Sequence, residues 1–162
     1  MNKNVLKTLL IVASLLQWSV TTKAQTDKPN ILWIVSEDNT TMIGSYGDKF
    51  ATTPNIDKLS SQGIQYNKAF SSAPVCAPSR STLITGMYPT GLGTENMRST
   101  YPVPAFIKFF PRYLREAGYY TTNNVKKDYN TIDQLQAWNE SSGTATYKNR
   151  KGNEFAFFIV CQ

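Results

Sequence analysis

The stretch VCAPSRSTLITG, residues 75–86, has the pattern of a short helix that follows an extended segment. Pro78 stands early, where a helix tolerates a proline, and Gly86 stands where helices commonly stop. The same stretch places Cys76 and Arg80 near the start of the predicted helix, so that a thiol and a permanent cation lie close together. This combination indicates a chemical role, and the fold that carries it can be read from the flanking segments.

Strand patterns occur at four places along the chain. NILWIV (30–35) is a continuous apolar run, which predicts a strand buried on both faces of a sheet. IQYNKAF (64–70) alternates apolar and polar residues as a strand does. YYTTN (119–123) and EFAFFIV (154–160) are rich in residues that favour strands.

Helix signals separate these strands. TTPNIDKLSSQG (52–63) has Thr53 as the expected N-cap, a proline after it and a glycine at its end. Ile56 and Leu59 are spaced to form one buried face of this helix. FPRYLREAG (110–118) again has an early proline and a final glycine.

The order of these elements is typical of an α/β fold with a mostly parallel sheet. Sites in such folds lie beyond the carboxyl ends of the strands, often at a helix N-terminus. SEDN (36–39) and CAPSR (76–80) both occupy such positions. The polar segment 128–153 is interpreted as a long surface excursion.

The first 24 residues are typical of a secretory signal peptide. A basic start precedes a short apolar run, and Thr22 and Ala24 are the small residues expected before a cleavage site. A membrane anchor is the alternative, which the short apolar run disfavours. We therefore expect export to the periplasm or beyond, with no stable membrane anchor and a mature domain over 25–162.

The charge of +6 does not indicate a nucleic-acid partner, because no arginine-rich run or aromatic-basic repeat is present. Cys76 and Cys161 are the two cysteines, and by default an exported chain would join them in a disulfide. The residues around Cys76 favour a chemical role instead. The chain contains no histidine, which excludes Ser-His-Asp triads, Cys-His dyads and histidine-rich zinc sites.

Cleavage of a stable anionic ester needs a nucleophile, a cation and donors to the ester oxygens. Glu37 and Asp38 are adjacent carboxylates of the kind that bind calcium or magnesium. Taken alone, an acidic pair after a strand is more often a solvated turn.

Cys-x-Pro-Ser-Arg followed by Thr-Gly fixes six positions, and this pattern resembles that of the formylglycine-dependent (type I) sulfatases of the alkaline-phosphatase superfamily. KPNILWIVSEDN (28–39) is similar to the family's first strand and metal-binding loop, and TPNIDKLSSQGIQYNKAF (53–70) to the segment before its nucleophile. LREAGYYTTNNVKKDYN (114–130) looks like the stretch that ends in Gly-Lys-Trp-His in many members. That likeness places Lys126 on the sulfate-binding lysine and Asp128 where those members carry histidine.

The resemblance implies an alkaline-phosphatase-like sandwich that hydrolyses sulfuric esters, with sulfated carbohydrate as the expected substrate. A formylglycine-generating maturation enzyme would oxidise Cys76 to an aldehyde. One hydroxyl of its hydrate would attack sulfur, and the other would allow sulfate to leave. Calcium, or alternatively magnesium, would be bound by Glu37, Asp38 and the residue at position 76.

The resemblance also assigns the remaining roles. Arg80 and Lys126 would act in catalysis beside Cys76, and Lys126 and Ser79 would contact the sulfate group. Glu95 lies near the place where relatives often have a histidine, and it is read as a loop residue in preference to a substitute base.

Length is the main departure from the family, whose members run to several hundred residues. We therefore expect residues 25–162 to be an incomplete, truncated N-terminal part of a sulfatase domain, and this chain to be an inactive fragment. Two alternatives stay open: a phosphonate or phosphodiester hydrolase of the same superfamily, and a non-catalytic exported remnant.

Overall fold

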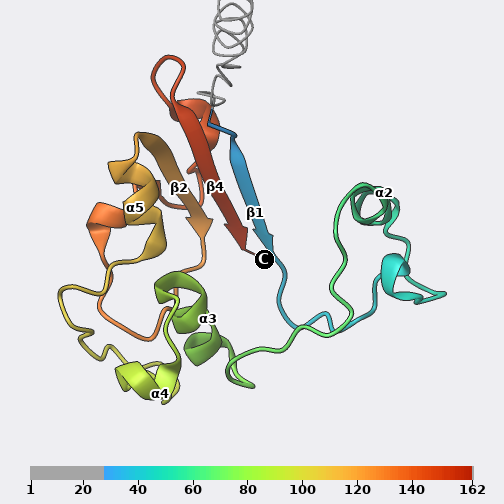
Figure 1. The fold of residues 1–162 in the computed structure, drawn as a ribbon, viewed down its shortest axis with the longest axis horizontal. Coiled ribbons are helices and arrows are strands. Elements are labelled where there is room, and N and C mark those ends of the chain that lie inside the picture. Colours follow the sequence, from blue (N-terminus) through green and yellow to red (C-terminus); the bar gives the residue numbers. More distant parts are fainter. Residues whose placement is uncertain (1–27, 162) are drawn as a thin grey trace, which may run out of the picture.

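The structure is a computed structural model that describes residues 28–161 (Figure 1). The signal peptide expected over residues 1–24 lies outside the described residues, and so does the side chain of Cys161. Across the described part of the chain, no helix has the length and apolar character needed to cross a membrane.

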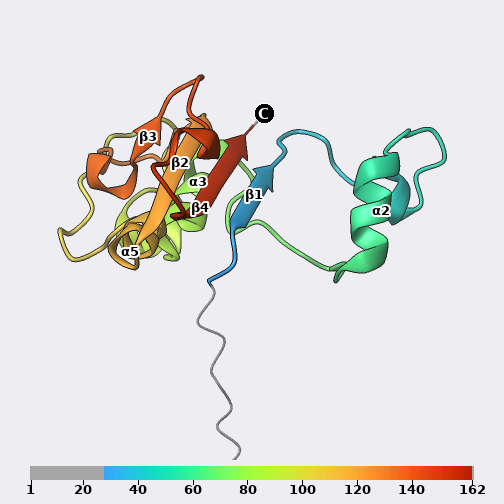
Figure 2. The ribbon, with the colours of Figure 1, turned by 90° about the horizontal axis from the view of Figure 1, so that it is seen from above.

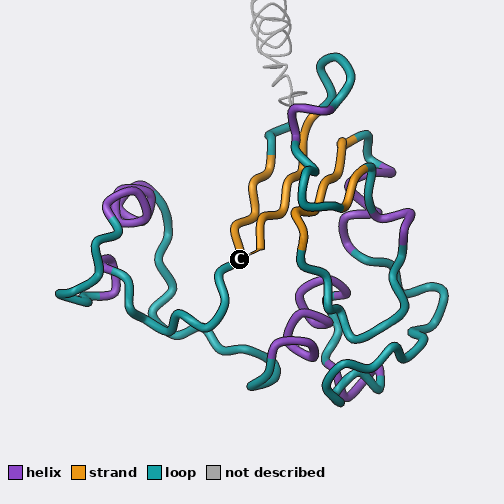
Figure 3. The backbone as a smooth tube through the Cα atoms, turned by 180° about the vertical axis from the view of Figure 1, so that it is seen from behind, coloured by secondary structure: helices purple, strands orange, loops and turns teal. Residues whose placement is uncertain are grey.

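A four-stranded parallel sheet forms the centre of the fold. Its strands are β1 (Ile31–Val35), β2 (Tyr119–Val125), β3 (Glu140–Ser141) and β4 (Phe155–Cys161), in the order β1-β4-β2-β3. The strands, orange in Figure 3, lie side by side. Every pairing is parallel, so all four carboxyl ends lie at one edge of the sheet. This arrangement confirms the predicted α/β fold with a parallel sheet.

One face of the sheet carries the hydrophobic core. Helix α5 (Phe110–Glu116) packs there, and the ring centre of Phe110 lies 5.1 Å from that of Trp33 and 5.3 Å from that of Phe157. Helix α3 (Cys76–Thr85) adds Ile84 to the same core. The buried core residues are Ile84, Phe109, Tyr119, Tyr129, Ala137, Trp138, Phe157 and Ile159.

Strand β1 is covered on one face only, which corrects the prediction that both faces are buried. Trp33 faces the core, whereas Leu32 and Ile34 are 61% and 65% exposed. The reason is the position of β1 at the edge of the sheet, with α5 on one face only. On the opposite face η3 (Tyr147–Asn149) packs against β4 and β2. Leu32 and Ile34 of β1 therefore remain exposed on that face.

The helix predicted from the opening motif begins slightly earlier than expected. Helix α3 starts at Cys76, and Pro78 sits in its first turn, where a missing N–H leaves no hydrogen bond unmade. Gly86 ends the helix as predicted, with a φ of 73° that favours glycine. A short helix α4 (Pro89–Leu92) follows it.

The segment between β1 and α3 forms an arm that extends away from the sheet (Figures 1 and 2). It contains η1 (Gly44–Tyr46) and α2 (Pro54–Gln62), the latter at the predicted place. The hydroxyl of Thr53 does not cap α2; it accepts a hydrogen bond from the N–H of Gly44 at 2.9 Å and donates to Asp57 Oδ1 at 3.0 Å. Thr53 therefore ties η1 to α2.

Two predictions about this arm are wrong. Ile56 and Leu59 are exposed, and no residue of α2 is buried. Residues 64–70 form a loop instead of a strand, with Tyr66 and Phe70 exposed. Because the arm stands apart from the sheet, no other described element covers its apolar side chains, and its loop has no strand to pair with.

The polar segment 128–153 is not a surface excursion, which is a further correction. It contributes β3, η2 (Leu135–Ala137) and η3, and it buries Trp138 and Ala145. Its polar residues bond to the sheet: the backbone N–H of Asn139 donates to Thr121 O at 2.8 Å, and Asn139 Oδ1 accepts from Thr121 N at 2.9 Å. These bonds tie an apparently loop-like sequence to β2.

Candidate active site

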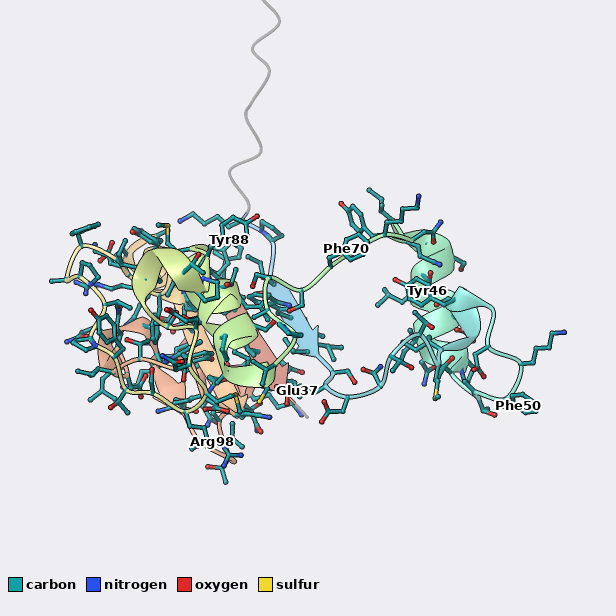
Figure 4. The ribbon with its side chains drawn as sticks, turned by 90° about the horizontal axis from the view of Figure 1, so that it is seen from below. Glu37, Tyr46, Phe50, Phe70, Tyr88 and Arg98 are labelled. Atoms are coloured by element: carbon teal, nitrogen blue, oxygen red, sulfur yellow. The ribbon has the colours of Figure 1, made fainter. Side chains whose placement is uncertain are left out.

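Three segments meet beyond the carboxyl edge of the sheet. Glu37 follows β1, the residues Lys126 to Asp128 follow β2, and α3 begins at Cys76. Glu37 lies where the sheet passes into the arm (Figure 4). The structure thus brings together side chains that are up to 89 positions apart in the chain.

Arg80 is the most constrained side chain of this site. Its Nε donates to Lys127 O and its Nη2 to Lys126 O, both at 2.7 Å, and its Nη1 lies 3.0 Å from Glu37 Oε1. The guanidinium also lies over the ring of Tyr129. Only 3% of Arg80 is exposed, so its charge is held in one orientation.

Glu37 is bound by two cations at once. Besides its bond with Arg80, its Oε2 forms an ion pair with Lys126 Nζ. Burial raises the pKa of Glu37, but the hydrogen bond and charge of Lys126, together with Arg80, outweigh burial and bring that pKa below its ordinary value. The hydrogen bond to Glu37 raises the pKa of Lys126 in turn.

Cys76 is the first residue of α3, and its thiol is free and partly buried. Its Sγ lies 4.0 Å from Asp128 Oδ2. The proximity of Cys76 is the smallest of the causes that raise the pKa of Lys126. The three residues that the sequence grouped as catalytic, Cys76, Arg80 and Lys126, are therefore neighbours.

Ser79 has a different environment from the one expected of a sulfate contact. Its hydroxyl is 2.7 Å from the hydroxyl of Ser71, in an open groove beside α3 that Phe70 and Tyr88 flank. Successive helix residues differ in direction by about 100°. Ser79 therefore lines the groove, whereas the next residue, Arg80, contacts Glu37 and the backbone of Lys126.

Asp38 and Glu95 lie outside the contacts made by Glu37, Arg80 and Lys126. Asp38 is exposed in a left-handed conformation, with a φ of 59°. Glu95 is also exposed, in the loop after α4. This position agrees with the sequence-based interpretation of Glu95 as a loop residue in preference to a substitute base.

The expected metal ligands do not form a metal site in this arrangement. No group of three or more His, Cys, Asp or Glu side chains that could hold a metal ion occurs among residues 28–161. Both carboxylate oxygens of Glu37 are taken by Arg80 and Lys126. A divalent cation would need this carboxylate to be released first.

Tyr129 and Asn130 are site residues that the sequence did not single out, and Asp128 was placed only at the position where relatives carry histidine. Asp128 faces the thiol and Tyr129 lies under Arg80. The amide of Asn130 bonds to Thr94 O and Asn96 O and accepts from the N–H of Ser99. The signal that could have found them is the string KKDYN (126–130) directly after a strand, where polar residues at a parallel-sheet edge gather.

This geometry defines an α/β protein with a cationic site at the carboxyl edge of a parallel sheet. The model of the family described as Sulfatase matches residues 29–156. The chain therefore belongs to the sulfatase family.

Individual relatives agree with this assignment. The ulvan-active sulfatase of Formosa agariphila is 39% identical over 146 residues, which cover 83% of this chain and 24% of that protein. Human iduronate 2-sulfatase is 38% identical over 97 residues, which cover 59% of this chain and 18% of that protein. The chain thus spans at most about a quarter of the length of these two relatives.

A solved structure supports the same family. It shows a protein in complex with its substrate D-glucosamine-2-N,6-O-disulfate, and it is 28% identical with a TM-score of 0.62. The alignment covers 71% of this chain and 23% of that one. The fold described here accordingly corresponds to one part of a larger sulfatase fold.

Proposed function

We propose that the protein is an exported sulfuric ester hydrolase and that this chain supplies the nucleophile and part of the sulfate-binding site. One observation carries the proposal: Cys76, Arg80 and Lys126, from two separate segments, lie together at the carboxyl edge of the sheet. A nucleophile beside two cations is what transfer of a sulfuryl group requires.

The residue at position 76 would act as formylglycine, which supplies paired hydroxyls as nucleophile and as the means of releasing sulfate. Arg80 would present a fixed guanidinium to the sulfate oxygens, because two backbone carbonyls hold it in place. Lys126 would add a point charge from a side chain that is 38% exposed and so accessible to a substrate. Ser79 would bind the substrate through its hydroxyl from the adjoining groove.

Calcium, with magnesium as the alternative, remains part of this proposal through Glu37 and Asp38. Both are hard oxygen donors in one loop. Glu37 could serve only after Arg80 and Lys126 release it, and no step of the reaction is derived through the cation.

Sulfated carbohydrate is the proposed substrate class. The names of the relatives support it, since one acts on ulvan and a structural neighbour holds a disulfated glucosamine. A maturation enzyme that converts Cys76 is the implied partner.

Mass spectrometry of the peptide that contains Cys76 tests the proposal directly. The chain would be exported from cells that also make a formylglycine-generating enzyme. We expect Cys76 to exchange its sulfur for oxygen with loss of two hydrogens, whereas Cys161 in the same molecule serves as an unmodified control. A thiol retained at Cys76 would refute the proposal.

The converted protein would then be assayed with an aryl sulfate and an aryl phosphonate, with Cys76→Ala as the blank. Preference for the sulfate supports a sulfatase. Preference for the phosphonate supports the alternative hydrolase, and conversion without turnover of either ester supports the non-catalytic remnant.

A further inference from the structure

A second cluster of cations lies at the other edge of the sheet, away from the candidate active site. The segment YKNRKG (147–152) contains η3 and the start of the turn before β4, and its cations are Lys148, Arg150 and Lys151. It lies at the amino end of β4 (Figure 1). The seven residues of β4 separate this end from the carboxyl edge by roughly 20 Å, at about 3.3 Å per residue. The two clusters are therefore distinct.

The charge of this segment is not used in ion pairs. Across the described part of the chain, none of its three cations pairs with a carboxylate. Two carboxylates contact the segment through neutral donors instead. Glu140 Oε2 accepts from Asn149 Nδ2 at 2.9 Å, and Glu154 Oε2 accepts from the backbone N–H of Lys151 at 3.1 Å. Both lysine side chains, Lys148 and Lys151, are exposed and so accessible to an anion.

An aromatic groove adjoins these cations. Tyr147 is 41% exposed, and its ring centre lies 5.9 Å from that of Phe158 in β4. The two residues line a groove of about 260 Å³ together with Leu32 and Arg150. Arg150 Nη1 donates to Tyr147 O at 3.0 Å, and its guanidinium carbon lies 5.7 Å from the ring centre of Tyr147. The guanidinium is therefore held at the side of the groove.

This combination fits a sulfated sugar. One face of a sugar ring consists of C–H groups that pack on an aromatic ring, and its sulfate groups pair with guanidinium and ammonium groups. The groove is near the lower limit of about 300 Å³ for small-molecule sites, so it has room for one sugar unit. Short segments rich in lysine and arginine also bind heparin-like polymers. A nucleic acid is disfavoured, because the sequence has no aromatic-basic repeat.

We propose that residues 147–151 form an accessory site for a sulfated polysaccharide, with a sugar ring on Tyr147 and sulfate groups on the three cations. The inference rests on the proposed function for the choice of ligand, since both sites then engage the same class of polymer. Because the sites lie at opposite edges of the sheet, the accessory site takes no part in hydrolysis. It raises the effective concentration of the polymer at the protein.

Calorimetric titration of the full chain with heparin, a densely sulfated polysaccharide, tests the accessory site at about 0.15 M salt. A triple variant removes the three charges: Lys148→Gln, Arg150→Gln and Lys151→Gln. We expect its affinity for heparin to fall roughly tenfold or more, because the affinity for a polyanion rises with the number of cations engaged. The control makes the same change of charge at exposed, scattered positions, and should keep most of the affinity: Lys58→Gln, Lys68→Gln and Arg98→Gln.

Two further variants sharpen the test. Tyr147→Ala should weaken heparin binding roughly threefold, the size of an aromatic contact. It should leave the binding of inorganic polyphosphate, which has no sugar ring, unchanged. Lys148→Gln combined with Lys151→Gln alters only exposed side chains, so the test of charge stands even if the change at Arg150 prevents folding.

Equal heparin affinity in the triple variant and its control would overturn the inference. Equal losses of heparin and polyphosphate binding in Tyr147→Ala would overturn it as well. So would a natural protein that binds DNA or phosphatidylserine vesicles as tightly as heparin, because the segment would then be a general anion surface.

The proposed function is tested separately by the conversion of Cys76. Cys76→Ala should bind heparin as the natural protein does. Loss of the accessory site in a protein whose Cys76 is converted refutes this inference alone. A retained thiol in a protein that binds heparin through residues 147–151 refutes the proposed function alone.

Discussion

The guanidinium carbon of Arg80 lies 5.4 Å from the ring centre of Tyr129, so a buried cation rests on an aromatic face at the edge of the sheet. With its bonds to two carbonyls and to Glu37, this contact makes Arg80 a link between α3, the loop after β1 and the loop after β2. The first prediction concerns this link.

Arg80→Lys keeps the positive charge but cannot donate to both carbonyls and to Glu37 while lying flat on Tyr129. We expect the free energy of unfolding to fall by about 3 kcal/mol, because buried acceptors lose charged donors. Urea denaturation followed by circular dichroism measures it. Arg98→Lys, at an exposed arginine (Figure 4), is the control, and equal losses in the two variants would contradict this account.

The second prediction concerns one atom, the side-chain amide nitrogen of Asn130. Its Nδ2 donates to the carbonyls of Thr94 and Asn96. Asn130→Asp replaces that donor by a carboxylate oxygen facing two acceptors, and we expect a loss of about 2 kcal/mol or more in unfolding free energy.

Thermal denaturation at neutral pH compares this variant with Asn153→Asp, which makes the same change at an exposed position. Only Asn130→Asp should melt earlier. A melting temperature unchanged by Asn130→Asp would show that the amide does not hold the 94–99 loop in place.

The third prediction contrasts the core with the arm. Phe157 is buried against Phe110, whereas Phe50 is 95% exposed at the far end of the arm (Figure 4). Phe157→Ala should lower the unfolding free energy by about 3–5 kcal/mol. Phe50→Ala should change it by less than about 0.5 kcal/mol. Chemical denaturation of both variants decides the matter, and a large loss on removing Phe50 would mean that the arm packs against the sheet in solution.

The fourth prediction concerns alkaline pH. Burial, with a hydrogen bond and charge from Glu140, raises the pKa of Tyr120 from 10.0 to about 12. The folded state thus holds this proton more tightly than the unfolded state. The resulting stability is fully present below pH 10 and is lost as the pH rises from 10 to about 12.

Unfolding free energies measured across that range should fall less steeply for Tyr120→Phe than for the natural protein. Glu140→Gln should give an intermediate slope, because it removes one of the causes that raise this pKa. Identical slopes for the natural protein and Tyr120→Phe would argue against a buried, proton-retaining phenol.

Several helices and strands could be predicted because their signals lie within their own residues. Proline and glycine at the two ends marked α2 and α3, and apolar runs marked β1 and β4. The predicted strand at residues 64–70 failed because strand formation depends on a pairing partner, which its own sequence cannot show.

For the candidate site, too, the sequence indicated the features that have a local signal and missed those that depend on contacts between distant residues. The motif around Cys76 and the position of Lys126 after β2 predicted that these residues lie close to Arg80, and in the structure Arg80 Nη2 donates to Lys126 O. Their catalytic roles stay a prediction. The roles of Glu37 and Ser79 depended on which group each side chain meets in space. Glu37 meets two cations and Ser79 meets Ser71, and neither pairing follows from sequence spacing.

The sheet also sets the timing of folding. The N–H of Ala156 bonds to the side chain of Asn30, 126 positions earlier, and β4 is the strand that joins β1 to β2. Contacts between such distant residues form late, because a long loop must close first. During synthesis, β1 and β2 therefore cannot be joined in one sheet beside the CAPSR motif until residues 155–161 have been made.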